Sequence, residues 1–182
     1  YNQILLNKTF REVFKKVFIP FLDHIGLLWQ TNTLTPAHEH FISNLIAQKI
    51  QINTESLQQN PPTNKDKTFI LYLPENEIHE LGLLYLNYEL SLRGYSSIYL
   101  GQSVPVGNLN SLLNKFDNIC LVSSFTVQPE THKIDNYLES VQAIIESKSC
   151  DFWIFGPKTA YIDSEKYPFV LFSGLLELLK SL

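Results

Sequence analysis

Short apolar runs alternate with stretches of helical periodicity from residue 68 to the end of the chain, and this alternation constrains the fold more than any other feature. The runs are rich in β-branched and aromatic residues, which predicts strands at 68–73, 97–100, 118–122, 152–155 and 169–172. The intervening patterns predict helices at 79–93, 106–116, 130–148 and 175–182. Strands that alternate with helices predict an α/β fold, flavodoxin-like (Rossmann-like), with a parallel sheet covered by helices on both faces.

The first third of the chain has helical periodicity only. Six apolar residues recur at helical spacing, which predicts an amphipathic helix: Phe10, Phe14, Val17, Phe18, Phe21 and Ile25. Pro20 should kink it, because proline lacks the N–H that a helix needs. Thr35 followed by Pro36 predicts the start of a second helix.

A polar stretch over residues 51–67 predicts a solvated linker between two modules. We therefore expect an N-terminal helical bundle over residues 1–60 and the α/β domain over residues 66–182. The chain begins with Tyr1 and contains no methionine, so we expect it to be a fragment that lacks an N-terminal module.

Charge and cysteine content exclude several classes of protein. The net charge is −4 and the basic residues are scattered, so this segment alone is not expected to bind DNA. There is no apolar run of membrane-spanning length and no signal peptide, which predicts a cytoplasmic protein. Cys120 lies in an apolar run and has no metal-ligand spacing to Cys150, which favours a buried thiol over a disulfide or a zinc site.

The loop after the first predicted strand contains an acid, a histidine and a glycine at close spacing: Glu77, His79 and Gly82. A neutral imidazole can ligate a metal while a carboxylate accepts the proton on its other nitrogen. A surface loop with a helix-capping acid is the simpler alternative. The chain lacks a glycine-rich phosphate loop, which counts against flavin nucleotide binding. It is also a poor fit to a phospho-acceptor receiver domain, because the third strand ends in Ser123 and Ser124 where such a domain needs an aspartate.

Three loop motifs in order carry a resemblance to cobalamin-binding domains. Glu77-x-His79-x-x-Gly82 resembles the glutamate form of the cobalamin motif Asp-x-His-x-x-Gly. Leu100-Gly101-x-x-x-Pro105 and Ser124-x-Thr126 follow on the next two loops. The resemblance implies that His79 replaces the vitamin's own base beneath cobalt, and that the displaced nucleotide tail enters a groove beside the sheet, past Ser124.

The loop after the fourth strand departs from that family. The family usually has two glycines there, and this chain has Gly156-Pro157. Gly156 can still allow a close approach of the tail, but proline removes a backbone donor and fixes a dihedral angle. The departure leaves open a chain that kept the fold and lost the cofactor.

The N-terminal helices carry a second resemblance. Trp29, nine further residues, and Glu39-His40 are similar to the signature of MerR-type, light-sensing, adenosylcobalamin-dependent transcriptional regulators. In that family the tryptophan and glutamate cover the upper face of the cofactor, and His40 is a second polar contact there. Without the resemblance, Trp29 would be a core residue and Glu39 a first-turn acid favoured by the helix dipole. His38 and His40 face different directions on a helix, which disfavours zinc.

The two resemblances together imply a sensor that is not an enzyme. Adenosylcobalamin would bind between the helical cap and the sheet, with Trp29, Glu39, His40, Glu77, His79, Gly82, Gly101, Ser124, Thr126 and Gly156 in contact. Cleavage of the cobalt–carbon bond, by light or chemistry, would remove the adenosyl group and shift the assembly equilibrium of a homo-oligomer. DNA binding by the missing N-terminal domain would change as a result. The alternative from another class is a corrinoid carrier that passes methyl groups, as methylcobalamin, between methyltransferases.

Overall fold

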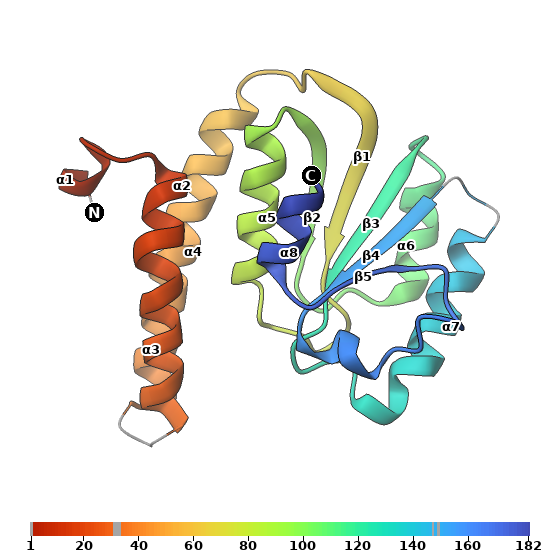
Figure 1. Ribbon diagram of the computed structural model, residues 1–182. Coiled ribbons are helices and arrows are strands. Elements are labelled where there is room, and N and C mark those ends of the chain that lie inside the picture. The colour runs from red at the N-terminus through yellow and green to blue at the C-terminus, as the bar shows by residue number, and fades with distance from the viewer. Residues whose placement is uncertain (1, 31–33, 147, 149) are drawn as a thin grey trace. The chain divides into compact units, whose positions relative to one another are not determined.

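A computed structural model of the chain describes residues 2–30, 34–146, 148 and 150–182, with only the backbone at residues 2, 4, 29 and 30. It forms two compact units, residues 1–53 and 54–182 (Figure 1). Unit 1 is helical and unit 2 contains the sheet. The predicted domain bounds of 1–60 and 66–182 stay a prediction, since the helix that leaves unit 1 continues into unit 2.

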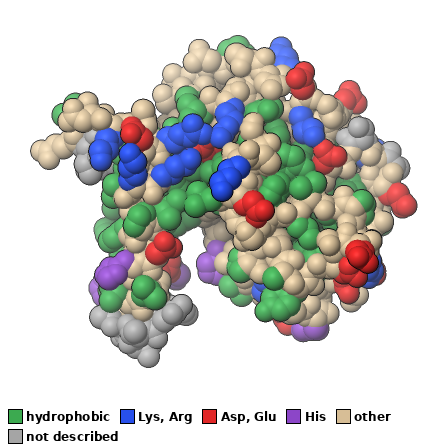
Figure 2. Space-filling view, in the orientation of Figure 1, with side chains coloured by type: hydrophobic (Ala, Val, Ile, Leu, Met, Phe, Trp, Pro, Cys, Tyr) green, Lys and Arg blue, Asp and Glu red, His purple; other side chains and the backbone are tan. Residues whose placement is uncertain are grey.

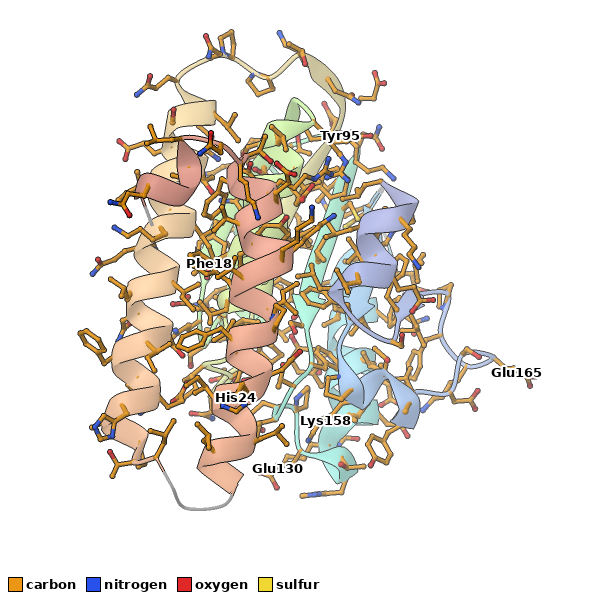
Figure 3. The ribbon with its side chains drawn as sticks, turned by 60° about the vertical axis from the view of Figure 1, so that its left-hand side comes forward. Phe18, His24, Tyr95, Glu130, Lys158 and Glu165 are labelled. Carbon is orange, nitrogen blue, oxygen red and sulfur yellow. The ribbon has the colours of Figure 1, made fainter. Side chains whose placement is uncertain are left out.

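Unit 1 consists of helices α1 (Asn2–Leu5), α2 (Phe10–Val13), η1 (Phe14–Phe18), α3 (Ile19–Gln30) and most of α4 (Pro36–Gln58). The first long helix starts with a capping box, in which the Thr9 side chain accepts from the Glu12 amide and the Glu12 carboxylate accepts from the Thr9 amide. The rings of Phe10, Phe14 and Phe18 pack against one another along its next turns. α3 and α4 run side by side, and His24 on α3 is exposed (Figure 3).

A π-helical turn precedes Pro20, where the sequence predicts a kink. Residues Phe14–Phe18 form this turn, and the amide of Ile19 donates to the Phe14 carbonyl, five residues back. A proline in a helix leaves a carbonyl without its partner and crowds the preceding turn, and a widened turn relieves both problems. The helix therefore continues directly from η1 into α3, in which Pro20 is the second residue.

α4 begins where the sequence predicts and ends later. Its first turn is capped by Thr35, whose carbonyl accepts from the amides of His38 and Glu39, and Pro36 is the first helical residue. The helix then continues through Gln58, so residues 51–58 of the predicted linker are helical. Residues 64–67 of the predicted linker already belong to the first strand, which begins at Asn64, and only residues 59–63 lie between the two elements. Most of residues 51–58 are exposed, which explains why all but Ile52 and Leu57 are polar, and Thr54 is buried.

Unit 2 confirms the predicted parallel sheet. Its strands are β1 (Asn64–Tyr72), β2 (Tyr95–Gly101), β3 (Ile119–Ser124), β4 (Cys150–Phe155) and β5 (Val170–Phe172). All neighbouring strands are parallel, in the order β2-β1-β3-β4-β5. This is the flavodoxin-like order, in which the chain changes direction of winding between β1 and β3.

Helices cover both faces of this sheet (Figure 1). They are α5 (Leu81–Leu92), α6 (Val106–Leu113), η2 (Thr131–Lys133), α7 (Ile134–Ile145), η3 (Pro157–Tyr161) and α8 (Leu175–Ser181). α6 and α7 pack on the face that includes Ile70, Leu121 and Phe152, which form the main core. α5 and α8 lie on the other face, toward which Trp153 and Phe155 point because side chains alternate along a strand.

The cysteines and helix lengths bear on two of the sequence expectations. Cys120 is fully buried in β3, and both cysteines are free thiols. Burial raises the pKa of the Cys120 thiol, so it is protonated at neutral pH.

Within the described ranges, none of the helices combines the length and the hydrophobicity that a membrane span requires. Over unit 2, acidic and basic side chains are interspersed on the face that Figure 2 shows.

Candidate functional site

The loops after β1 and β3 lie next to each other at the carboxyl edge of the sheet. β1 pairs directly with β3, with Tyr72 opposite Ser123. Ligands of open α/β sheets bind outside the carboxyl ends of the strands, at the point where the winding reverses. The motif with His79 and the motif with Ser124 therefore flank this point.

Glu77 is the centre of the hydrogen bonding in this region. Its carboxylate is fully buried and accepts five hydrogen bonds. On Oε1 it accepts from the backbone amides of Ile78 and His79, both at 3.0 Å, and contacts His79 Nδ1 at 2.6 Å. On Oε2 it accepts from the backbone amides of Val127 and Gln128, at 2.6 and 2.7 Å. One side chain thus joins the loop after β1 to the loop after β3.

These donors keep Glu77 ionised. Burial alone would raise the pKa of this carboxyl, but the hydrogen bond from His79 and those from the amides of Gln128, His79 and Val127 outweigh it and lower the pKa to about 2. A buried carboxylate is stable when several N–H groups point at it. Glu77 is therefore an anion at neutral pH, able to accept a proton shared with the imidazole.

His79 carries its imidazole at the surface of the site. Its side chain is 52% exposed, while its partner Glu77 is buried. The carboxylate, an acceptor, favours the tautomer with hydrogen on Nδ1. A metal bound by this imidazole would then be bound through Nε2, the geometry in which a carboxylate orients a metal-ligating histidine.

The loop after β2 joins the same edge. Gly101 has φ +86°, a conformation that glycine adopts without strain. Two side chains that follow it reach the His79 loop: Ser103 Oγ accepts from the Asn76 amide at 3.1 Å, and Gln102 Nε2 donates to the Ile78 carbonyl at 3.3 Å. The Gly101-x-x-x-Pro105 motif therefore lies beside the first motif.

Ser124 and Thr126 lie at the end of β3, but Ser124 is closed off. Only 4% of Ser124 is exposed, and its hydroxyl is 3.4 Å from that of Thr126. Its register partner on β4 is Phe155, a buried aromatic residue. The structure thus brings Ser124 to the predicted edge but shields it with protein atoms.

Gly82 has a different neighbour from the one the sequence predicts. We expected it to allow a ligand to approach the start of the helix, but a Cβ atom at this position would lie 3.4 Å from the ring of Phe155. The space over Gly82 is filled by the protein's own side chain.

Gly156 is explained by the protein backbone as well. Its φ is +117°, and a Cβ atom there would come within 2.7 Å of the Phe125 carbonyl oxygen. Next to it, the Phe125 amide donates to the Phe155 carbonyl and the Lys158 amide donates to the Phe125 carbonyl. Lys158 also donates from Nζ to the Pro129 carbonyl at 2.7 Å, near the bottom of Figure 3. Pro157 begins the short helix η3, where its missing N–H is not required.

Replacing Gly156 with alanine is expected to lower the free energy of unfolding by about 2 kcal/mol, because the new Cβ meets a backbone oxygen and the φ is unfavourable. Chemical denaturation of the ligand-free protein measures this. Gly107→Ala in α6 is the matched control, since a Cβ there has no atom within 4 Å. Equal stability of the two variants would contradict this account of Gly156.

The predicted residues of unit 1 lie on α3 and α4. Trp29 is in α3, but its side chain lies outside the described residues. Glu39 Oε2 is 2.8 Å from His40 Nδ1, and Glu39 Oε1 accepts from Ser43 Oγ at 2.7 Å. His38 instead pairs with Thr35, at 2.9 Å. Glu39 and His40 therefore form a polar pair in the first turns of α4.

The residues at the carboxyl edge fit one side of a corrin cofactor and not the other. The donor set fits, because a neutral imidazole oriented by an ionised carboxylate is a normal ligand for a transition metal. The side expected to hold a nucleotide tail does not fit, because the ring of Phe155 lies against Gly82 and Phe155 is the sheet neighbour of Ser124. This disagreement concerns the tail and leaves His79 unaffected.

Two features of the site were not predicted from the sequence. The amides of Val127 and Gln128 clamp Glu77 from a loop fifty residues away, and backbone donors leave no mark on residue type. Glu80, one residue after His79, accepts a hydrogen bond from the Tyr99 hydroxyl at 2.6 Å. Nothing in the sequence marks these two residues as partners, since they are 19 positions apart and tyrosine is common in strands.

Comparisons with known proteins point to cobalamin as a ligand of this chain. Residues 1–52, which make up nearly all of unit 1, match a family model described as a B12 binding domain. A segment of 98 residues is 32% identical to the HTH-type transcriptional repressor CarH of Myxococcus xanthus, and covers 54% of this chain and 31% of that protein. The chain thus matches about a third of the length of this curated relative.

Solved structures with the same fold include two corrinoid proteins. The Methanosarcina barkeri monomethylamine corrinoid protein superposes with a TM-score of 0.78 at 14% identity, over 99% of this chain and 85% of that one. A cobalamin-binding protein from Desulfitobacterium hafniense DCB-2 superposes with a TM-score of 0.52 at 13% identity, over 91% and 78%. These likenesses show the fold, and with the family match and the sequence similarity they support cobalamin as the ligand of this chain.

Proposed function

We propose that this chain is the cobalamin-binding sensory region of a transcriptional regulator, with His79 as the lower ligand of cobalt. One observation carries the proposal: the 2.6 Å contact between His79 Nδ1 and the buried, ionised carboxylate of Glu77, at the carboxyl edge of the sheet. A surface loop with a capping acid has no need of a buried carboxylate that accepts five hydrogen bonds.

The residues of the chain set the state of the imidazole. Glu77 holds the proton on Nδ1 and so keeps the lone pair on Nε2 directed away from the carboxylate. The amides of Val127 and Gln128 hold Glu77 in place, which fixes the orientation of the ring. Cobalamin, when bound, supplies a cobalt–carbon bond that light or chemistry can cleave.

The regulatory half of the proposal rests on the similarity to a transcriptional repressor. We assign Trp29, Glu39 and His40 to the upper ligand, 5'-deoxyadenosyl: an indole is a flat apolar surface, and a carboxylate accepts hydrogen bonds from ribose hydroxyls. A ligand that binds one assembly state more tightly than another favours that state. Loss of the adenosyl group would change this preference, and so would change the population of a homo-oligomer. DNA binding would belong to a part of the protein outside this chain.

A corrinoid methyl carrier is the alternative function, and its upper side would have to open to a partner enzyme. It has no use for contacts with an adenosyl group, so the two functions differ in which upper ligand they prefer. A third class, a chain that has lost the cofactor, would bind neither form.

The test is reconstitution in the dark with adenosylcobalamin or methylcobalamin, followed by visible spectra and gel-filtration volumes before and after green light. We expect co-elution with adenosylcobalamin, a histidine-ligated spectrum, and a change of elution volume on illumination. Trp29→Ala is expected to reduce the preference for the adenosyl form while leaving the lower-ligand spectrum intact. His24→Ala, an exposed residue of the same helix, is the control for Trp29.

Each alternative gives a different result in this experiment. A preference for methylcobalamin, with no light-dependent change in size, would replace the sensor by the carrier. No co-elution and no spectral change with either form would exclude both cobalamin functions.

A further inference from the structure

Phe155 lies beside Gly82 and Ser124, the two residues past which the nucleotide tail of a cobalamin was expected to run. It is the last residue of β4 and only 3% exposed. Its ring lies against Gly82 at the start of α5, and its register partner in the sheet is Ser124. Partners in a parallel sheet point to the same face, so Phe155 stands beside Ser124 on the face that α5 and α8 cover (Figure 1).

The two small residues that would accommodate a tail are in contact with the protein itself. Gly82 faces the Phe155 ring, and Gly156 faces the Phe125 carbonyl oxygen. An open hollow of about 360 Å³ does exist near this edge. Its walls are Gly156, Pro157, Thr159, Ala160, Leu171, Ser173 and Glu177. Neither Gly82 nor Ser124 lines it, so it is not the groove expected beside Ser124.

Opening a tail groove would be costly in this chain. Displacing the phenylalanine ring would break its packing contacts in the core and expose its apolar surface to water, and both effects are unfavourable. A corrinoid held by His79 alone avoids this cost, because the imidazole contacts cobalt and not the tail. The affinity gained by burying a tail base is thus cancelled, in whole or in part, by displacing Phe155.

We propose that this chain binds corrinoids through His79 with the nucleotide tail left outside the α5 side of the sheet, so that it accepts corrinoids that differ in, or lack, the lower base. This inference rests on the proposed ligation of cobalt by His79. It assigns Phe155 as the residue that determines specificity for the lower half of the ligand. The ligand class becomes corrinoids in general, including cobinamide, which has no nucleotide.

The test compares aquocobalamin with aquocobinamide by titration of the full chain in the dark, with the visible spectrum as readout. We expect cobinamide to bind wild type at least as tightly as cobalamin does, since nothing is gained from the nucleotide. Phe155→Val should open the groove while retaining a good strand former, and should shift the affinity ratio toward cobalamin by about tenfold or more. Phe155→Leu is the second variant, and circular dichroism checks that each one folds.

Phe152→Val is the matched control, because it is the same change in the same strand on the opposite face, within the core under α6 and α7. It should leave the affinity ratio unchanged. Adding Gly82→Ala to Phe155→Val should remove part of the gain, because the methyl group projects into the space that the ring has left.

The outcomes separate this inference from the proposed function. Tenfold or greater preference of wild type for cobalamin, or an affinity ratio that neither Phe155 variant changes, would overturn the role of Phe155 and leave His79 ligation standing. Failure of wild type to change the spectrum of either corrinoid would overturn both proposals.

Discussion

Replacing His79 with alanine is expected to weaken cobalamin binding by at least about a hundredfold and to abolish the spectrum of histidine-ligated cobalt. Loss of a residue that only orients a metal ligand already costs about 10- to 100-fold in affinity, and the ligand itself should cost no less. Titration of the ligand-free chain with aquocobalamin, followed in the visible range, gives both the affinity and the ligation state.

The control for this variant is His132→Ala, since His132 is a well-exposed histidine in η2 of the same unit. It should leave affinity and spectrum at their wild-type values. Identical spectra for wild type and the His79 variant would refute the assignment of the lower ligand, whatever happens to the affinity.

The second large effect concerns stability. Glu77→Ala is expected to lower the free energy of unfolding of the ligand-free protein by about 3–5 kcal/mol, because it removes a buried anion whose partners stay in place. Four backbone amides lose their acceptor, those of Ile78, His79, Val127 and Gln128. Each unsatisfied buried donor costs about 1–3 kcal/mol, and partial access of water to these loops keeps the sum below the full total.

Urea denaturation measures this effect, and two further variants identify its cause. Glu77→Gln keeps the size of the side chain but presents an NH₂ group to two of the donors, so an intermediate loss of about 2 kcal/mol is expected. Glu75→Ala, an exposed acid of the same loop, should change stability by less than about 0.5 kcal/mol. If Glu77→Ala were as mild as Glu75→Ala, the carboxylate would not be what joins the two loops.

The elements of unit 2 were predictable because their signals are local. Each strand has an apolar run of its own, and the buried segments of β3 and β4 lie where those runs are. The π-helical turn before Pro20 could not be predicted in the same way. A proline removes one helical N–H, and a helix can accommodate this loss by a kink or by a π-helical turn. The helical residues 51–58 were missed because a polar composition is shared by linkers and by exposed helix surfaces.

The site was predictable where residue type carries the chemistry. Glu77 and His79 could be paired from their spacing, and the structure gives 2.6 Å between them. What spacing could not reveal was the second half of the carboxylate's contacts, because any residue supplies a backbone amide. The shielding of Ser124 was missed for a related reason: Phe155 and Gly82 are far apart in sequence, and only the sheet order brings the ring and the glycine together.

The hydrogen bonds from Val127 and Gln128 to Glu77 make the His79 motif depend on a part of the chain that follows it by fifty residues. These contacts span 50 and 51 residues, so a nascent chain that ends in α6 contains the whole His79 motif without the amides that hold its carboxylate. Contacts of such long sequence separation form only after the loop between them has closed, here by pairing of β3 with β1. Until then the Glu77 carboxylate lacks two of its five donors, so the orientation of the His79 imidazole depends on the pairing of β3 with β1.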